Sequence, residues 1–130
     1  SYYRRGLALN PRSGTALDRY LFFGMQHRTS SSMKECVEMA SAFLVDHPLA
    51  ALILVDRALC RQFMRQDAAA GSDFERAARV TADPRYFTLA GWAAKRNGNA
   101  REARRLFRLA LRADFRFRPA RFALARLPHV

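Results

Sequence analysis

Apolar residues return every three to four positions along most of the chain, which is the period of an amphipathic α-helix. Strict alternation of apolar and polar residues, the signature of a half-buried strand, is absent, and β-branched residues are sparse. The pattern therefore predicts an all-α protein. The expected helices lie near residues 13–27, 33–46, 48–65, 72–82, 85–96, 100–113 and 118–127, after a helix tail at 1–9.

The breaks between these helices recur at a near-regular spacing. Pro11, Pro48 and Pro84 each follow a short polar or acidic stretch, at intervals of 37 and 36 residues, and a degenerate break without proline stands 31 residues later at Phe115. Proline ends one helix and suits the first turn of the next. Helix pairs with a period of 31–37 residues predict an α-solenoid of about three antiparallel pairs.

Three capping-box patterns fall between the proline breaks and predict where the second helix of each pair begins. They are Ser32 to Glu35, Ser72 to Glu75 and Asn99 to Glu102. The middle helix has an alternative start at Asp67, which would leave Gly71 inside the helix at a cost of about 1 kcal/mol.

Residues 84–117 carry a more specific pattern. Phe87, Gly91, Ala103, Phe107 and Ala110 stand at large, small, small, aromatic and small positions, and this segment resembles the tetratricopeptide repeat. The resemblance implies that the two helices of the pair approach closely where Gly91 meets Ala103, while Phe107 fills the gap towards the next unit. It is weaker over 48–83 and 11–47. We expect residues 1–130 to form one such repeat domain, as a possible piece of a longer chain.

The resemblance also implies a binding surface, because the first helix of each tetratricopeptide pair lines the concave face. The corresponding positions in 84–117 are Arg85, Thr88, Trp92, Lys95 and Arg96. In the preceding unit they are Leu49, Leu52, Asp56, Leu59 and Cys60. Asp56 is expected to point to water or to pair across the groove with Lys95 or Arg96. Trp92 either anchors a partner or packs on the neighbouring helix. The helix near 48–65 is apolar nearly all round, so we expect it to be packed on two sides.

Charge adds a second candidate surface. The chain of 130 residues has a formal net charge of +12, and residues 95–130 hold eleven basic and two acidic side chains. Arg101, Arg105, Arg108 and Arg112 fall within about 60° of one another on a helical projection. This ridge is either a solvated outer face or a contact surface for a polyanion, such as nucleic acid or an acidic surface.

Catalytic chemistry has little support in the sequence. The three histidines, His27, His47 and His129, have no Cys or acidic residue at metal-ligand or triad spacing, and Cys36 and Cys60 lie in apolar helical contexts typical of small core residues. No glycine-rich phosphate loop or apolar run of membrane-spanning length occurs. We expect no enzyme, metal or cofactor, and a cytoplasmic location.

The leading functional hypothesis is a non-catalytic scaffold that binds a partner protein or an acidic peptide in the groove. One alternative is polyanion binding through the Arg ridge. Another is a helical appendage of a larger bacterial enzyme or secretion component. Exposed ends of the solenoid would also permit self-association.

Overall fold

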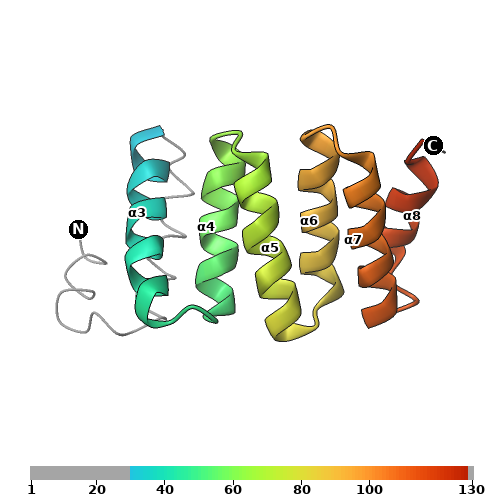
Figure 1. The fold of residues 1–130 in the computed structure, drawn as a ribbon, viewed down its shortest axis with the longest axis horizontal. Coiled ribbons are helices and arrows are strands. Elements are labelled where there is room, and N and C mark those ends of the chain that lie inside the picture. The colour runs from blue at the N-terminus through green and yellow to red at the C-terminus, as the bar shows by residue number, and fades with distance from the viewer. Residues whose placement is uncertain (1–29, 129–130) are drawn as a thin grey trace.

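The computed structural model describes residues 30–128, and these form six α-helices arranged side by side in one row (Figure 1). No strand occurs between residues 30 and 128, which confirms the all-α prediction. The helices are α3 (Ser30–Asp46), α4 (Ala51–Phe63), α5 (Asp67–Thr81), α6 (Pro84–Arg96), α7 (Ala100–Ala113) and α8 (Arg118–Arg126). The expected helix at 13–27 and the tail at 1–9 lie outside the described residues.

Each helix packs mainly on the next one in sequence, so the described chain is a solenoid of successive antiparallel neighbours. α4 pairs with α5 and α6 with α7, as the repeat pattern predicted, while α3 precedes the first pair and α8 follows the second. Short connections of two to four residues favour this antiparallel arrangement. Among the described residues, no helix has both the length and the apolar character needed to cross a membrane.

Helix ends follow local sequence chemistry where the signal is strong. Asp83 caps α6, its side chain accepting a hydrogen bond of 2.9 Å from the backbone N–H of Arg85, and Pro84 occupies the first turn. Asn99 caps α7 by accepting a bond of 3.1 Å from the N–H of Glu102. Gly98, at φ 79°, supplies the left-handed residue that ends the preceding turn. These caps confirm the predicted breaks at 82–84 and 97–99.

The predicted starts of two other helices were wrong. α5 begins at Asp67, the alternative start, so Ser72 lies inside the helix and Gly71 is interior as well. Glu75 binds Arg79 and Arg105 through its carboxylate. Ser32 likewise lies inside α3 and does not open it.

α4 is also shorter than predicted, and it ends before Arg65, whose φ of 61° is incompatible with a continuing helix.

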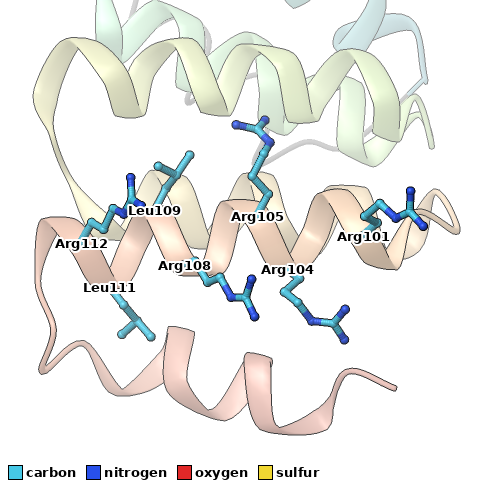
Figure 2. A pocket seen from close by; sticks show the side chains of 7 residues that line it. All are labelled: Arg101, Arg104, Arg105, Arg108, Leu109, Leu111 and Arg112. Carbon is cyan, nitrogen blue, oxygen red and sulfur yellow. The ribbon is translucent and has the colours of Figure 1, made fainter. Parts of the chain in front are cut away.

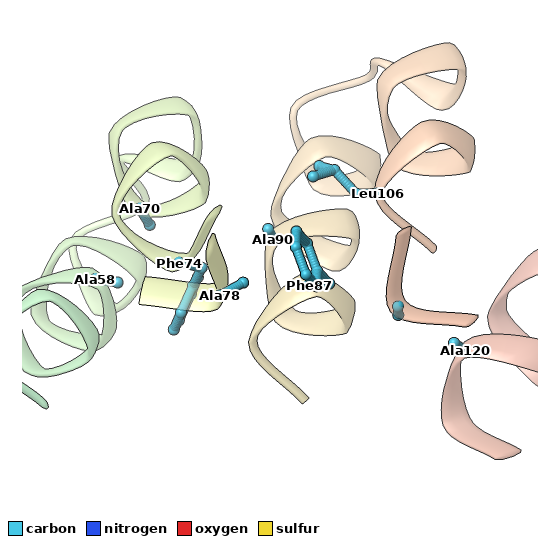
Figure 3. Packing of buried hydrophobic residues seen from close by; sticks show 9 residues of the cluster. Ala58, Ala70, Phe74, Ala78, Phe87, Ala90, Leu106 and Ala120 are labelled. Atoms are coloured by element: carbon cyan, nitrogen blue, oxygen red, sulfur yellow. The ribbon is translucent and has the colours of Figure 1, made fainter. Parts of the chain in front are cut away.

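Small residues allow the helices to approach closely in the centre of the stack (Figure 3). The central cluster contains two aromatic rings and Leu106 among many alanines, which interdigitate across α4 to α8. Its buried members are Ala58, Ala70, Phe74, Ala78, Phe87, Ala90, Leu106, Ala110 and Ala120.

Gly91 marks the closest approach within the α6–α7 pair. A Cβ built on Gly91 would lie 2.4 Å from Cε1 of Phe107, so the prediction of close approach at Gly91 is confirmed. The nearest atoms belong to the Phe107 ring, which lies across Gly91. Phe107 also reaches the buried residues Ala123 and Leu127 at the α8 end of the stack, as expected for a residue that fills the gap to the next unit.

A buried carboxylate ties α4 to α5, and sequence patterns gave no sign of it. Asp73 accepts bonds of 2.9 and 2.7 Å from Arg57 and of 2.8 Å from Arg61, while Arg57 also donates to Ser41 of α3. The Asp73 side chain is almost wholly buried. Paired and hydrogen-bonded charges of this kind tolerate burial, whereas an isolated one would not.

Candidate functional site

The first helices of the two described pairs present neighbouring rows of partly exposed side chains. On α4, Leu52, Leu59 and Phe63 fall within about 40° of one another around the helix axis. Leu52 is 59% exposed and Phe63 43% exposed, which is unusual for side chains of this size. We call these three residues, with Arg85, Trp92 and Lys95 of α6, the first-helix face.

The apolar row on α4 bears on the expectation that this helix is packed on two sides. α4 does pack on two sides, against α3 and against α5. Its apolar circumference is wider than these two contacts need: Leu52 and Phe63 are exposed, while Leu59 between them is half-buried against the central cluster. The signal was present in the sequence as the i, i+7, i+11 spacing, but only packing could tell which apolar stripe is left uncovered.

Trp92 occupies the middle of the α6 part of the face. Its ring makes an edge-to-face contact with Phe107, with centroids 5.5 Å apart and planes at 70°. The Nζ of Lys95 lies 4.9 Å from the Trp92 ring centroid, within the range of a cation–π interaction. Trp92 is therefore held by a core residue on one side while part of its surface stays accessible.

Arg85 stands at the start of α6, where it is fixed by the capping residue. Its Nη2 lies 2.6 Å from Oδ2 of Asp83. Hydrogen bonding to Arg85 lowers the pKa of the Asp83 carboxyl below its ordinary value, and the same bond raises the pKa of the Arg85 guanidinium. The two residues therefore remain charged at neutral pH, and the Arg85 side chain stays largely exposed.

The structure places two of the predicted binding residues in internal contacts. Thr88 is 5% exposed, and its hydroxyl donates 2.8 Å to the backbone carbonyl of Pro84. Arg96 donates to Asp67 at 3.0 Å and to the side chain of Gln62 at 2.9 Å, which ties the end of α6 to the start of α5. Both residues thus have a structural contact in addition to any predicted binding role.

Asp56 corrects a further expectation. The side chain does not point to water, because Asp56 is only 6% exposed. The two cations named as examples of a cross-groove partner have other contacts: Arg96 binds Asp67 and Gln62, and Lys95 lies over the Trp92 ring. Asp56 is buried on α4 close to Cys60, where its charge contributes to a raised pKa of the thiol.

The two cysteines are buried and form no disulfide within residues 30–128, as predicted for small core residues. The Cys36 and Cys60 thiols are hydrogen-bonded to each other; this bond and burial raise the pKa of Cys60, while the same bond lowers the pKa of Cys36. Burial keeps both thiols away from solvent. His47 is exposed and stacks on Phe43 with ring centroids 4.6 Å apart; His27 and His129 lie outside the described residues. Within the described part of the chain, no three His, Cys, Asp or Glu side chains gather as a metal site would require.

A second surface runs along the outer side of α7 (Figure 2). Five arginines line a cavity of about 710 Å³ together with Leu109 and Leu111. We call these arginines the α7 arginine row: Arg101, Arg104, Arg105, Arg108 and Arg112. Figure 2 shows them fanning out from one helix, with Arg105 towards α5 and with Arg104 and Arg108 towards α8. The four arginines of the predicted ridge all belong to this row, and their role as a contact surface stays a prediction.

Arg105 differs from its neighbours in the row. It donates to Glu102 of the same helix and, at 3.0 Å, to Glu75 of α5. Hydrogen bonding to Arg105 lowers the pKa of Glu102, and the bond to Glu102 raises the pKa of Arg105. Glu102 stands three residues before Arg105 in the sequence, whereas Glu75 is 30 residues away and becomes a partner only through helix packing. In residues 30–128, no ion pair forms at Arg101, Arg108 or Arg112.

The C-terminal end of the described stack also exposes aromatic side chains. Phe122 lies with Arg118, Arg121 and Ala125 around a shallow cavity on the outer side of α8, and Phe115 is exposed in the preceding loop. Self-association through this end stays a prediction.

Similarity to known proteins is found at the level of structure and not at the level of sequence. The sequence gives no significant match to protein-family models or to curated proteins. The structure is similar to a thermophilic tetratricopeptide repeat protein of Thermus thermophilus, with a TM-score of 0.73, 15% identity, and coverage of 95% of this chain and 68% of that one.

Two further similar structures come from bacterial secretion systems. One is the type III secretion chaperone SycD of Yersinia enterocolitica in complex with a peptide of the translocator YopD, with a TM-score of 0.70, 17% identity, and coverage of 88% and 94% of the two chains. The other is a type III secretion complex of Aeromonas hydrophila, with a TM-score of 0.65, 20% identity, and coverage of 93% and 81%. The chain therefore has the tetratricopeptide-like helical repeat fold.

Proposed function

We propose that this chain is a non-catalytic binding domain that holds a segment of a partner protein along the first-helix face. The observation that carries the proposal is the exposure of Leu52 and Phe63 beside Arg85, Trp92 and Lys95 on consecutive first helices. Clustered large apolar side chains that remain accessible in a folded domain are typical of interaction surfaces. Trp and Arg are also the residue types that dominate binding energy at protein interfaces.

The chemistry of the face favours a segment that is both apolar and acidic. The α4 row offers Leu52, Leu59 and Phe63 to apolar side chains of the partner, whereas the α6 row offers Arg85 and Lys95 to carboxylates. A charge of +12 on the whole chain would speed the encounter with an acidic partner. Thr88 and Arg96 flank the face, and we assign them a supporting role through their internal contacts.

The comparison with SycD supports this proposal, because that protein was determined with a bound peptide on the same fold. An identity of 17% does not transfer its partner to this chain. The proposal therefore rests on the residues of the first-helix face and names only the chemistry of the partner.

Intrinsic fluorescence offers a direct test, because Trp92 is the single tryptophan of the chain. Peptides selected from a random display library would be titrated into the full chain while Trp92 emission is recorded. We expect selected sequences rich in apolar and acidic residues, and a blue shift as the partner excludes water from the ring. Binding without any change in Trp92 emission would contradict the proposed location.

Two matched variants separate the face from other exposed apolar positions. Leu52→Ser should weaken peptide binding about tenfold or more, which corresponds to about 1.4 kcal/mol. Val80→Ser removes a comparably exposed apolar side chain from α5 and should leave the affinity unchanged. Equal losses in the two variants would show that exposure in general, and not the first-helix face, drives the interaction.

A further inference from the structure

The α7 arginine row is an electrostatic feature that the first-helix face does not explain. Three of its members, Arg101, Arg108 and Arg112, form no ion pair within residues 30–128, and all three are exposed. Like charges one turn apart on a helix repel each other and lower helix stability by a few tenths of a kcal/mol per pair. The row therefore costs folding free energy unless an anion compensates it.

The positive potential is concentrated on one narrow part of the surface. Residues 100–126, which form α7 and α8, contain nine arginines and two acids, Glu102 and Asp114. The neighbouring α5 is different, because its sequence holds three acids and two arginines. On the α5 side of the row, a hollow is lined by Asp67, Glu75 and Glu102. The cationic surface thus ends at the α5–α7 boundary, and its long direction follows α7.

We propose that the α7 arginine row binds the phosphate backbone of a double-stranded nucleic acid without reading its base sequence. The row from Arg101 to Arg112 extends about 16 Å at the helical rise of about 1.5 Å per residue. A duplex carries one negative charge per about 1.7 Å of its axis, so about ten phosphates of the two strands lie along that length. Arg105 is already bound to Glu102 and Glu75, so the remaining four guanidinium groups of the row meet this dense line of charge. Guanidinium also forms the bidentate hydrogen bonds that phosphate oxygens favour.

An acidic protein segment matches this row less well. An extended peptide advances about 3.3 Å per residue, and its side chains alternate between two faces. Even a segment made only of Asp and Glu would present about two or three carboxylates to the row over about 16 Å. The proposed acidic and apolar partner of the first-helix face would present fewer.

The lining of the cavity suits contact with the phosphate backbone. Leu109 and Leu111 are its only members besides the five arginines. No Asn, Gln or aromatic side chain lines it to bind adenine or to stack on an unpaired base, and a guanidinium group, although it can bind guanine, also forms bidentate bonds with phosphate. Positioning on phosphates alone gives affinity that depends on salt and is indifferent to sequence.

The experiment measures fluorescence anisotropy of a labelled 20-base-pair DNA duplex of mixed sequence with the full chain, between 50 and 300 mM NaCl. We expect binding whose log affinity falls with log salt at a slope of about −3 to −4, from about 0.9 for each phosphate contact of the four arginines without a carboxylate partner. The variant Arg101→Ala/Arg108→Ala/Arg112→Ala should reduce the magnitude of that slope by about 2 to 3. A second duplex of unrelated sequence should bind with the same affinity within a factor of about three.

The matched control removes three positive charges elsewhere, as Lys34→Ala/Arg65→Ala/Arg76→Ala, and should keep the wild-type slope. Circular dichroism melting shows whether both triple variants fold. Absence of binding at 50 mM NaCl, equal slopes for the two variants, or a tenfold preference between the duplexes would each overturn the proposal. So would binding to poly-glutamate or to phosphatidylserine vesicles as tight as binding to the duplex. The first-helix face is not involved, so Leu52→Ser should leave duplex binding intact.

Discussion

The contact between Gly91 and Phe107 offers the sharpest test of how the repeat is packed. Replacing Gly91 by Ala adds a single methyl group, which would sit 2.4 Å from Cε1 and 2.6 Å from Cδ1 of the Phe107 ring. Ordinary contacts of a Cβ are at 3.4–4 Å, so the ring would have to retreat by about 1 Å. Phe107 is wholly buried among Ala103, Ala123 and Leu127, and has no room to do so.

Two opposing effects determine how much Gly91→Ala changes the free energy of unfolding. Alanine is favoured over glycine in a helix interior by about 1 kcal/mol. Forcing a methyl group into a close-packed core costs about 1 to 3 kcal/mol, and occasionally more. The overlap at Phe107 is with a rigid ring and not with the end of a flexible chain, so we place the cost at the upper end. The net expectation is a loss of about 2 kcal/mol in the free energy of unfolding.

The assay is urea denaturation followed by circular dichroism and by Trp92 fluorescence, since the Trp92 ring contacts Phe107. Gly71→Ala is the natural comparison, because its Cβ would meet Ala93 at 3.3 Å, a much milder overlap, and we expect a change within about 1 kcal/mol. A Gly91→Ala protein as stable as the wild type would refute the reasoning. In the background of Phe107→Ala, the same Gly91→Ala change should become neutral or stabilising.

The remaining predictions concern single helix ends and the buried ion pair. Asp73→Ala should lower the free energy of unfolding by about 3 kcal/mol or more in urea titration, because it leaves Arg57 and Arg61 without their buried carboxylate. As a control, Arg79→Ala removes an exposed ion pair and should change the free energy of unfolding by less than about 0.5 kcal/mol. Gly98→Ala should cost about 1 kcal/mol in thermal or urea unfolding, because φ is 79° there, and a gain in stability would contradict the cap assignment. Asp83→Ala should cost about 1 kcal/mol at pH 7 through loss of the α6 cap. Because the pKa of Asp83 is lowered in the folded state from 3.8, its ionic contribution is present above that value and is lost as the pH falls through the lowered pKa. The difference between wild type and Asp83→Ala should therefore shrink in unfolding measured below about pH 3, and a constant difference would argue against the ion pair with Arg85.

The breaks between helices could be predicted from the sequence because their causes are local. Pro84 lacks a donor and fits a first turn, Asp83 and Asn99 reach amides two or three residues away, and Gly98 adopts a positive φ at no steric cost. The start of α5 was left open between Ser72 and Asp67, because each offers a local start signal. The helix begins at Asp67 and continues through Ser72.

The candidate surfaces also combine features that the sequence determines locally with features that only helix packing determines. The sequence alone determined the helical period, the pairing of helices, the Arg-rich face of α7 and the tetratricopeptide pattern around Gly91 and Phe107, because each is set by spacing within one or two helices. Only the tertiary structure decided that Leu52 and Phe63 stay exposed while Asp56 is buried, and that Arg105 is neutralised while Arg108 is not. Arg105 and Glu75 are 30 residues apart in sequence, and they meet only because α5 and α7 both pack against α6. Such contacts depend on how whole helices stack, and no short window of sequence contains that information.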